Sequence, residues 1–305
     1  MAIVQTDIPM TSARCDRAIT ALIEKYTFLR GETLTTTAFG RPVRTLVIGH
    51  GPRKVIYTAA HHANEWITTP VILKFVEELA EAFEKGRKIW NTDPKTILDT
   101  AAIYTVPMVN PDGVDLVTGA ISEESEQFED AEDLAEFYPD IPFPEGWKAN
   151  LRGVDLNLQY PAGWLQAREI KFAQGFTRPG PRDYVGRAPL TQPEPRALAG
   201  YTEFIDPALV LAYHAQGQVI YWQFRDYFVP GAEELGRRLA QASGYSLEET
   251  PYASSFAGYK DWFIQKFRRP GYTIEVGRGV SPLPLSQFDE IYRDNLGILV
   301  TAALG

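Results

Sequence analysis

The stretch that decides the fold is Lys54–Trp66, "KVIYTAAHHANEW". Its first seven residues form an apolar run that predicts a buried strand. Two histidines and a glutamate follow at once, although the chain of 305 residues holds only four histidines. A His-x-x-Glu pair can bring a ring nitrogen and a carboxylate to one metal ion if the chain turns sharply after the strand. His62 has Glu65 three residues on, whereas His61 has Asn64, a poor zinc ligand, so His62 and Glu65 are the candidates.

Two further strand-like runs supply the other groups that a hydrolytic zinc site needs, namely a third ligand and a base for the bound water. His214 ends the apolar run "LVLAYHAQG" and is the predicted third ligand; taken alone, it also fits a core histidine bonded to a backbone carbonyl. Glu275 lies in "GYTIEVGRG", where a charge is costly unless it is paired or functional, and it is the predicted base. The carboxyl ends of strands are where α/β sheets bind ligands.

Apolar runs and amphipathic segments alternate along the chain, which predicts an α/β sandwich with a mixed, mostly parallel sheet. The run "RTLVIGHG" precedes "KVIYTAA" across a Gly-Pro pair and suggests a hairpin or adjacent strands. "NPDG" at residues 110–113 predicts a turn at the end of another strand. Helices are expected near the N-terminus and at residues 69–86, 231–244 and 285–304. No repeat or linker divides residues 1–305, so one domain is expected.

The acidic character of the chain is local. The net charge is −9, but residues 123–145 hold ten acids and no base, and the remainder carries +1. This acidic insertion, about residues 119–147, is interpreted as a solvated surface loop with one or two helical turns. The chain has no basic stripe or nucleic-acid-reading motif, and no uncharged apolar run approaches the ~18–20 residues of a membrane span. Cys15 is the only cysteine, which excludes an internal disulfide and a Cys-based metal site.

A second unusual segment, residues 160–196, is rich in proline and glycine. Long irregular segments inside compact domains are usually functional, although a plain surface excursion is an equal alternative. The segment carries six bases: Arg168, Lys171, Arg178, Arg182, Arg187 and Arg196. These bases predict an environment that suits a substrate rich in carboxylates.

Five motifs in order give the chain a family resemblance. They are "HANEWI", "NPDG", "RGVDLN", "AYHAQG" and "TIEVG", between about Arg41 and Glu275. The chain resembles the M14 zinc carboxypeptidases, and the resemblance implies a three-layer α/β/α fold and one Zn²⁺ per chain. It also implies that His62, Glu65 and His214 bind the zinc and that Glu275 is the general base. His61 and His50 match no functional position of that family and are expected to be structural.

The sequence departs from the family where substrates are held. Members usually carry Asn-Arg after Val-Asp-Leu, and the pair grips the free α-carboxylate of a C-terminal residue. Here Asn157 is present, but Leu158 stands in place of the arginine, and leucine cannot make a bidentate grip. The arginine that polarises the scissile carbonyl aligns with Lys148, while Arg152 lies nearby; we favour Arg152 because a guanidinium fork suits a developing oxyanion.

Two more substrate positions follow from the resemblance. The tyrosine that closes over the substrate aligns with Tyr252, with Tyr259 as the alternative. Lys260 stands just before Asp261-Trp262, where the family places residues at the base of the side-chain pocket. A lysine there would suit a substrate with an extra carboxylate.

The combination "WKANLRGVDLNLQYPAGW" with the basic segment is similar to the bacterial γ-D-glutamyl-diaminopimelate peptidases, which cut peptidoglycan stem peptides. A peptidoglycan-derived muropeptide is therefore the expected substrate. The alternatives are an ordinary metallocarboxypeptidase, a non-catalytic peptidoglycan-binding relative and an acyl-amino-acid deacylase. No signal peptide or LysM module is present, which predicts a cytoplasmic enzyme, or a wall-associated one if the chain is a fragment. The sequence predicts no oligomeric state.

Overall fold

The computed structural model describes residues 2–305. A seven-stranded sheet has the strand order β3-β5-β4-β6-β9-β7-β8, and a separate hairpin pairs β1 with β2. The strands are β1 (Thr33–Thr36), β2 (Pro42–Arg44), β3 (Leu46–Ile48), β4 (Arg53–Ala59), β5 (Ala101–Val106), β6 (Leu209–Ala215), β7 (Val219–Tyr221), β8 (Ser246–Glu248) and β9 (Gly271–Val276). The β3–β5 and β7–β9 pairs are antiparallel and the other pairs of the large sheet are parallel, so the predicted mixed, mostly parallel sheet is confirmed.

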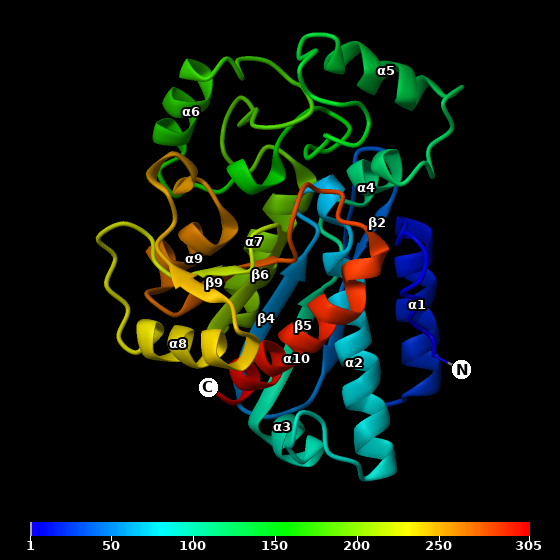
Figure 1. Ribbon diagram of the computed structural model, residues 1–305, viewed down its shortest axis with the longest axis vertical. Coiled ribbons are helices and arrows are strands. Elements are labelled where there is room, and N and C mark those ends of the chain that lie inside the picture. The colour runs from blue at the N-terminus through cyan, green and yellow to red at the C-terminus, as the bar shows by residue number, and fades with distance from the viewer. Residues whose placement is uncertain (1) are drawn as a thin grey trace.

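Helices cover both faces of the sheet (Figure 1). The α-helices are α1 (Ser12–Lys25), α2 (Thr68–Lys85), α3 (Pro94–Thr100), α4 (Pro111–Val117), α5 (Glu126–Ala135), α6 (Trp164–Ala173), α7 (Pro193–Ile205), α8 (Ala232–Ser243), α9 (Tyr259–Phe267) and α10 (Phe288–Leu304). Short 3₁₀ turns are η1 (Ala63–Glu65), η2 (Leu156–Leu158), η3 (Tyr252–Ser254) and η4 (Leu285–Gln287). None of the helices in residues 2–305 is both long and apolar enough to cross a membrane.

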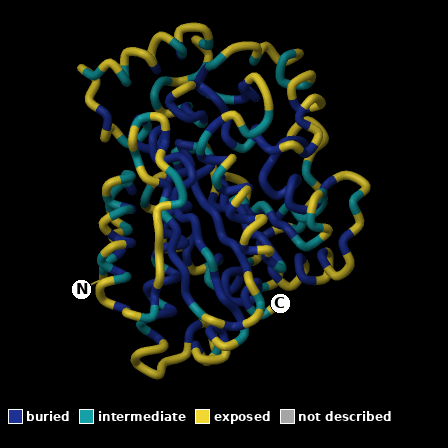
Figure 2. The backbone as a smooth tube through the Cα atoms, turned by 180° about the vertical axis from the view of Figure 1, so that it is seen from behind, coloured by how far each residue is buried: buried dark blue, intermediate teal, exposed yellow. Residues whose placement is uncertain are grey.

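The central strands are buried on both faces, as Figure 2 shows. Alternate residues of β6 enter different hydrophobic clusters: Leu209, Leu211 and Tyr213 pack with α1, α2, α8 and α10, whereas Val210 and Ala212 pack with α7 and α9. This is the period of two that a strand imposes on its side chains. The two clusters form the interior on either side of the sheet and fix β4, β6 and β9 side by side with parallel carboxyl ends.

Two local predictions were wrong. The runs "RTLVIGHG" and "KVIYTAA" become β3 and β4, but they are not neighbours, because β5 lies between them. "NPDG" does not form an isolated turn and instead begins α4: the Asn110 side chain accepts a hydrogen bond from the backbone N–H of Gly113 (3.1 Å), and Pro111 occupies the first turn. Asparagine at the N-cap followed by proline favours the start of a helix, so this sequence is compatible with an isolated turn and with a helix N-terminus.

The two unusual segments lie together above the carboxyl ends of the central strands, at the top of Figure 1. The acidic segment contains a longer helix than predicted, since α5 has ten residues. Ser125 caps this helix, and two of its own residues, Ala131 and Ala135, are buried. The basic segment is not irregular throughout, because it contains the ten-residue helix α6. Tyr138 of the acidic segment stacks on Phe176 of the basic segment, with ring centroids 5.6 Å apart, and its hydroxyl donates to the Arg178 carbonyl (2.8 Å).

Candidate metal centre and active site

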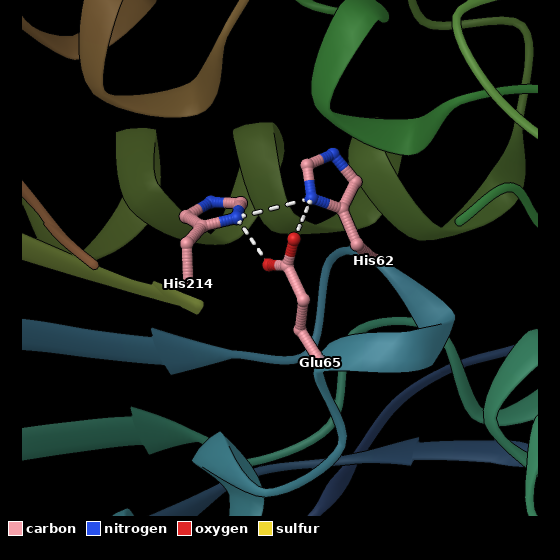
Figure 3. A group of neighbouring side chains, drawn as sticks. All are labelled: His62, Glu65 and His214. Carbon is pink, nitrogen blue, oxygen red and sulfur yellow. Dashed lines mark hydrogen bonds and ion pairs between the residues drawn. The ribbon is translucent and has the colours of Figure 1, made fainter. Parts of the chain in front are cut away.

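His62, Glu65 and His214 converge at the carboxyl ends of β4 and β6 (Figure 3). The chain turns sharply after β4, where Ala60 adopts a φ of 49° and donates its N–H to Thr68 Oγ1 (3.0 Å). The two carboxylate oxygens of Glu65 lie 2.9 Å from His62 Nδ1 and 2.9 Å from His214 Nδ1. The strand-end histidine and the His-x-x-Glu pair therefore meet as predicted.

The donor atoms have the spacing that one small cation requires. The Nδ1 atoms of His62 and His214 lie 3.3 Å apart. Tetrahedral zinc with bonds of about 2.1 Å separates its ligand atoms by roughly 3.4 Å. Two imidazoles and a carboxylate are also the donor set of many catalytic zinc sites. The residues and their spacing therefore fit a zinc ion.

Asp155 orients His62 and was missed as a site residue, although the motif "RGVDLN" contains it. Its Oδ1 lies 3.3 Å from His62 Nε2, so the imidazole directs Nδ1 toward Glu65 and His214. Burial alone would lower the pKa of His62, but the carboxylates of Glu65 and Asp155 outweigh it and raise that pKa to about 9. A carboxylate behind a ligand histidine fixes its tautomer and direction.

Glu275 lies across from His214 in the register of β6 and β9. Burial, followed by the neighbouring charge of Glu65, raises the pKa of Glu275 to about 8. Among residues 2–305 no hydrogen bond or ion pair holds its carboxylate. A proton acceptor poised in this way, beside a group that can hold a metal, suits general-base chemistry.

A cavity of about 250 Å³ opens beside the metal group, and we call it the catalytic cavity. Its lining includes His62, His214, Glu275, Lys148, Asn157, Leu158, Lys171, Arg182, Tyr259, Lys260 and Asp261. Lys148 Nζ lies 3.0 Å from Glu65 Oε1. Asn157 accepts a hydrogen bond from the Tyr259 backbone N–H through Oδ1 (3.0 Å), which leaves its amide N–H groups for a ligand. The predicted residues Lys148, Asn157 and Lys260 therefore share one cavity with the metal group.

Three predictions about individual side chains need correction or refinement. Arg152 is exposed and does not line the catalytic cavity; its charge acts instead on the buried carboxylate of Glu194. Lys148, the alternative to Arg152, does line the cavity. Lys260 lines the cavity, but its ammonium is held by Gln223 O (2.6 Å), Thr250 Oγ1 (3.0 Å) and the Asp261 carboxylate (2.6 Å).

The two candidate tyrosines occupy different environments. Tyr252 is 60% exposed and lies outside the catalytic cavity, where its ring packs against Phe256. Tyr259 lines the cavity but is buried, with its hydroxyl 2.8 Å from Thr202 Oγ1. Of the two rings, only that of Tyr252 is exposed to solvent.

The remaining predicted features lie as follows. Of the six bases in the basic segment, only Lys171 and Arg182 line the catalytic cavity. The other four have exposed side chains. His61 is buried against Tyr160 and Tyr259, and His50 is exposed beside Asp99. Leu158 packs within a hydrophobic cluster, so position 158 offers no cationic group to the cavity.

Three chain segments are tied together beneath the metal group. The backbone N–H groups of Ala63 and Asn64 donate to the carbonyls of Lys148 (3.0 Å) and Trp147 (3.1 Å). The Asn110 amide donates to the carbonyls of His61 (3.2 Å) and Ala149 (2.9 Å). A Cβ atom on Gly113 would lie 2.4 Å from the Ala149 carbonyl oxygen, so only glycine fits this close approach. The ligand-bearing turn is therefore held by Asn110 and by residues 147–149, at the end of the acidic segment.

Comparisons with known proteins agree with this geometry. Residues 17–297 match the Peptidase_M14 zinc carboxypeptidase family. Gamma-D-glutamyl-L-diamino acid endopeptidase 1 of Lysinibacillus sphaericus is 42% identical over 276 residues, which cover 90% of this chain and 67% of that protein.

Two solved structures share the fold. Bovine thrombin-activatable fibrinolysis inhibitor, solved in complex with tick carboxypeptidase inhibitor, matches with a TM-score of 0.73 and 17% identity, over 98% of this chain and 97% of that chain. Murein-tripeptide amidase MpaA from Escherichia coli O157 matches with a TM-score of 0.53 and 20% identity, over 89% of this chain and 91% of that chain. With its matched family, ligand group and sheet, this chain belongs to the M14 zinc carboxypeptidase family of metallopeptidases.

Proposed function

We propose that this chain hydrolyses the amide bond between the γ-carboxyl group of D-glutamate and a diamino acid, meso-diaminopimelate in particular, in peptides derived from peptidoglycan. One observation carries the proposal: position 158 lacks the carboxylate-gripping arginine, yet four bases line the catalytic cavity: Lys148, Lys171, Arg182 and Lys260. A substrate with several carboxylates suits such a wall. The 42% identical relative named for action on gamma-D-glutamyl-L-diamino acid bonds supports the same substrate class.

His62, Glu65 and His214 would hold one zinc ion per chain. When bound, zinc supplies a Lewis acid for the scissile carbonyl and lowers the pKa of a water molecule. Glu275 accepts a proton from the attacking water and passes it to the nitrogen of the leaving diamino acid, so the amide C–N bond breaks and a carboxylate and an amine result. Its raised pKa suits both acceptance and delivery of that proton near neutral pH.

The remaining side chains have binding and stabilising roles in the proposal. Lys148, beside Glu65, stabilises the negative charge that develops on the carbonyl oxygen. The Asn157 amide donates to a substrate oxygen, and Tyr252 closes over the bound peptide. Lys260 with Asp261 forms the polar base of the cavity. Residues 1–305 act together as one peptidase domain.

The test uses the tripeptide L-Ala-γ-D-Glu-meso-diaminopimelate and an α-linked L-peptide of equal length, with products identified by mass spectrometry. The wild-type protein with one zinc per chain should cleave only the γ-linked bond. Glu275→Gln should retain zinc and lose turnover about 10²- to 10⁴-fold, because the proton acceptor is gone. Glu169→Gln, which changes an exposed glutamate on α6, is the matched control and should remain active. Release of C-terminal residues from the α-linked peptide, or full activity without zinc, would refute the proposal.

A further inference from the structure

Arg182 lies where two hollows of the surface meet. A second hollow of about 260 Å³ adjoins the catalytic cavity, and we call it the side hollow. Four of its lining residues, Lys148, Arg182, Tyr221 and Glu275, line the catalytic cavity as well. Arg182 and Glu275 therefore both lie at the junction of the two hollows.

Asp183 holds the guanidinium group of Arg182 through its Nε atom. Its Nε donates to Asp183 Oδ2 (2.7 Å), and the same buried carboxylate binds Lys171 Nζ through Oδ1 (2.6 Å). Within residues 2–305, no hydrogen bond or ion pair engages Nη1 or Nη2 of Arg182. The donors of both Nη groups are therefore unused, and the side chain is 39% exposed.

The other bases of the catalytic cavity already have partners. Lys148 is paired with Glu65 (3.0 Å), and Lys171 is paired with Asp183. Lys260 is held by two oxygen acceptors and by Asp261. Among the lysines and arginines of the described chain that line the cavity, Arg182 is thus the one whose terminal nitrogens have no partner.

The substrate class supplies a carboxylate within reach. A γ-linked glutamyl residue keeps its own α-carboxylate on the acyl side of the scissile bond, which an ordinary α-linked residue does not. Four bonds join that carboxylate carbon to the scissile carbonyl carbon, a span of up to about 5 Å. Arginine binds a carboxylate through two parallel N–H···O bonds, which gives directional selection.

We propose that Arg182 binds the α-carboxylate of the γ-linked glutamyl residue and so makes the enzyme select γ-glutamyl bonds that carry this charge. The inference rests on the proposed function and adds the residue that recognises the acyl side. Arg182 acts in this role as a specificity-determining residue for substrate binding. In this proposal the cation that binds a substrate carboxylate is Arg182, on the acyl side of the scissile bond. On the leaving side, Leu158 stands in place of the family's arginine.

The experiment compares two tripeptides that differ only in this group: one contains γ-D-glutamate, and the other contains D-isoglutamine, in which the α-carboxylate is a neutral amide. Wild-type protein should cleave the first at least 10-fold more efficiently, as kcat/KM. Arg182→Ala should lose about 10- to 100-fold on the first and less than about 3-fold on the second. Arg182→Lys should recover only part of the preference, because charge remains without the fork. Arg187→Ala removes an exposed base of the same segment and should match wild type.

The outcomes separate the two proposals. If wild type cleaves the γ-D-glutamyl peptide and Arg182→Ala loses equally on both peptides, Arg182 acts elsewhere and this inference fails while the proposed function stands. An undiminished preference in Arg182→Ala overturns it as well. If wild type cleaves neither peptide, the proposed function itself fails. Zinc content and melting temperature, measured for each variant, exclude loss of the fold as the cause.

Discussion

Glu194, in the first turn of α7, is a charged group that the proposed chemistry does not use. Its side chain is 1% exposed, and neither carboxylate oxygen has a hydrogen-bond partner among the described residues. The nearby Asn150 amide donates instead to Gln192 Oε1 (2.9 Å). Burial, with a smaller contribution from the charge of Asp112, raises the pKa of Glu194 from 4.5 to about 7. The carboxylate form is therefore unfavourable in the folded chain.

The size and pH dependence of this penalty follow from the shift. Between pH 4.5 and about 7 the folded state binds more protons at Glu194 than the unfolded state, so stability falls as the pH rises through this window. Each pKa unit corresponds to about 1.4 kcal/mol, which gives a penalty of roughly 3 kcal/mol above pH 8 and less than about 1 kcal/mol at pH 5. The neutral isostere in Glu194→Gln removes the titration and should stabilise the fold by these amounts.

Urea unfolding of wild type and Glu194→Gln at pH 5 and pH 8.5, with equal zinc, measures the difference. Glu169→Gln, on the exposed face of α6, is the control and should change stability by less than about 0.5 kcal/mol at either pH. A variant that is less stable than wild type at pH 8.5, or equally stabilised at both pH values, would show that the Glu194 carboxylate has a partner in solution and would refute the reasoning.

Two further predictions concern the site. Asp155→Asn should weaken zinc binding 10- to 100-fold in competition with a chelator, because His62 loses the carboxylate that fixes its tautomer; unchanged affinity would remove Asp155 from that role. Lys148→Met should lower kcat on the γ-D-glutamyl tripeptide at least 10-fold, whereas Arg152→Met should leave it within about 2-fold, since Arg152 lies outside the catalytic cavity. The reverse order in steady-state kinetics would restore Arg152 as the oxyanion partner.

The sequence predicted those parts of the site that local spacing determines. His62 and Glu65 are three residues apart on one turn, and His214 ends an apolar strand, so the local pattern made each a candidate and the ordered motifs of the family resemblance assigned them together. The order of β3, β5 and β4 depends on a crossover between distant residues, which chain proximity does not encode. Side chains of all three strands share one hydrophobic cluster with α2 and α10.

The directions of side chains in the loops could not be predicted from the sequence. Arg152 and Lys148 are four residues apart in one non-repetitive stretch, and only the fold shows that the lysine enters the cavity while the arginine points to solvent and Glu194. Asp155 was present in a quoted motif, but its role depends on where His62 directs its Nε2 atom. Nothing in the sequence separated the six bases of the basic segment either. In the structure, Lys171 and Arg182 differ from the other four because both pair with Asp183.

The stacking of Tyr138 on Phe176 has a consequence for how this enzyme can diversify. The turn that presents Arg182 is supported by the inserted segments. Residues 147–149 link that turn to the metal group, because their carbonyls hold the ligand-bearing turn while the N–H groups of Lys148 and Ala149 donate to the Pro181 carbonyl. Exchange of residues 119–196 between relatives would therefore replace Lys148 and Asp155 together with Arg182, so selectivity and the support of the metal group are inherited as one unit.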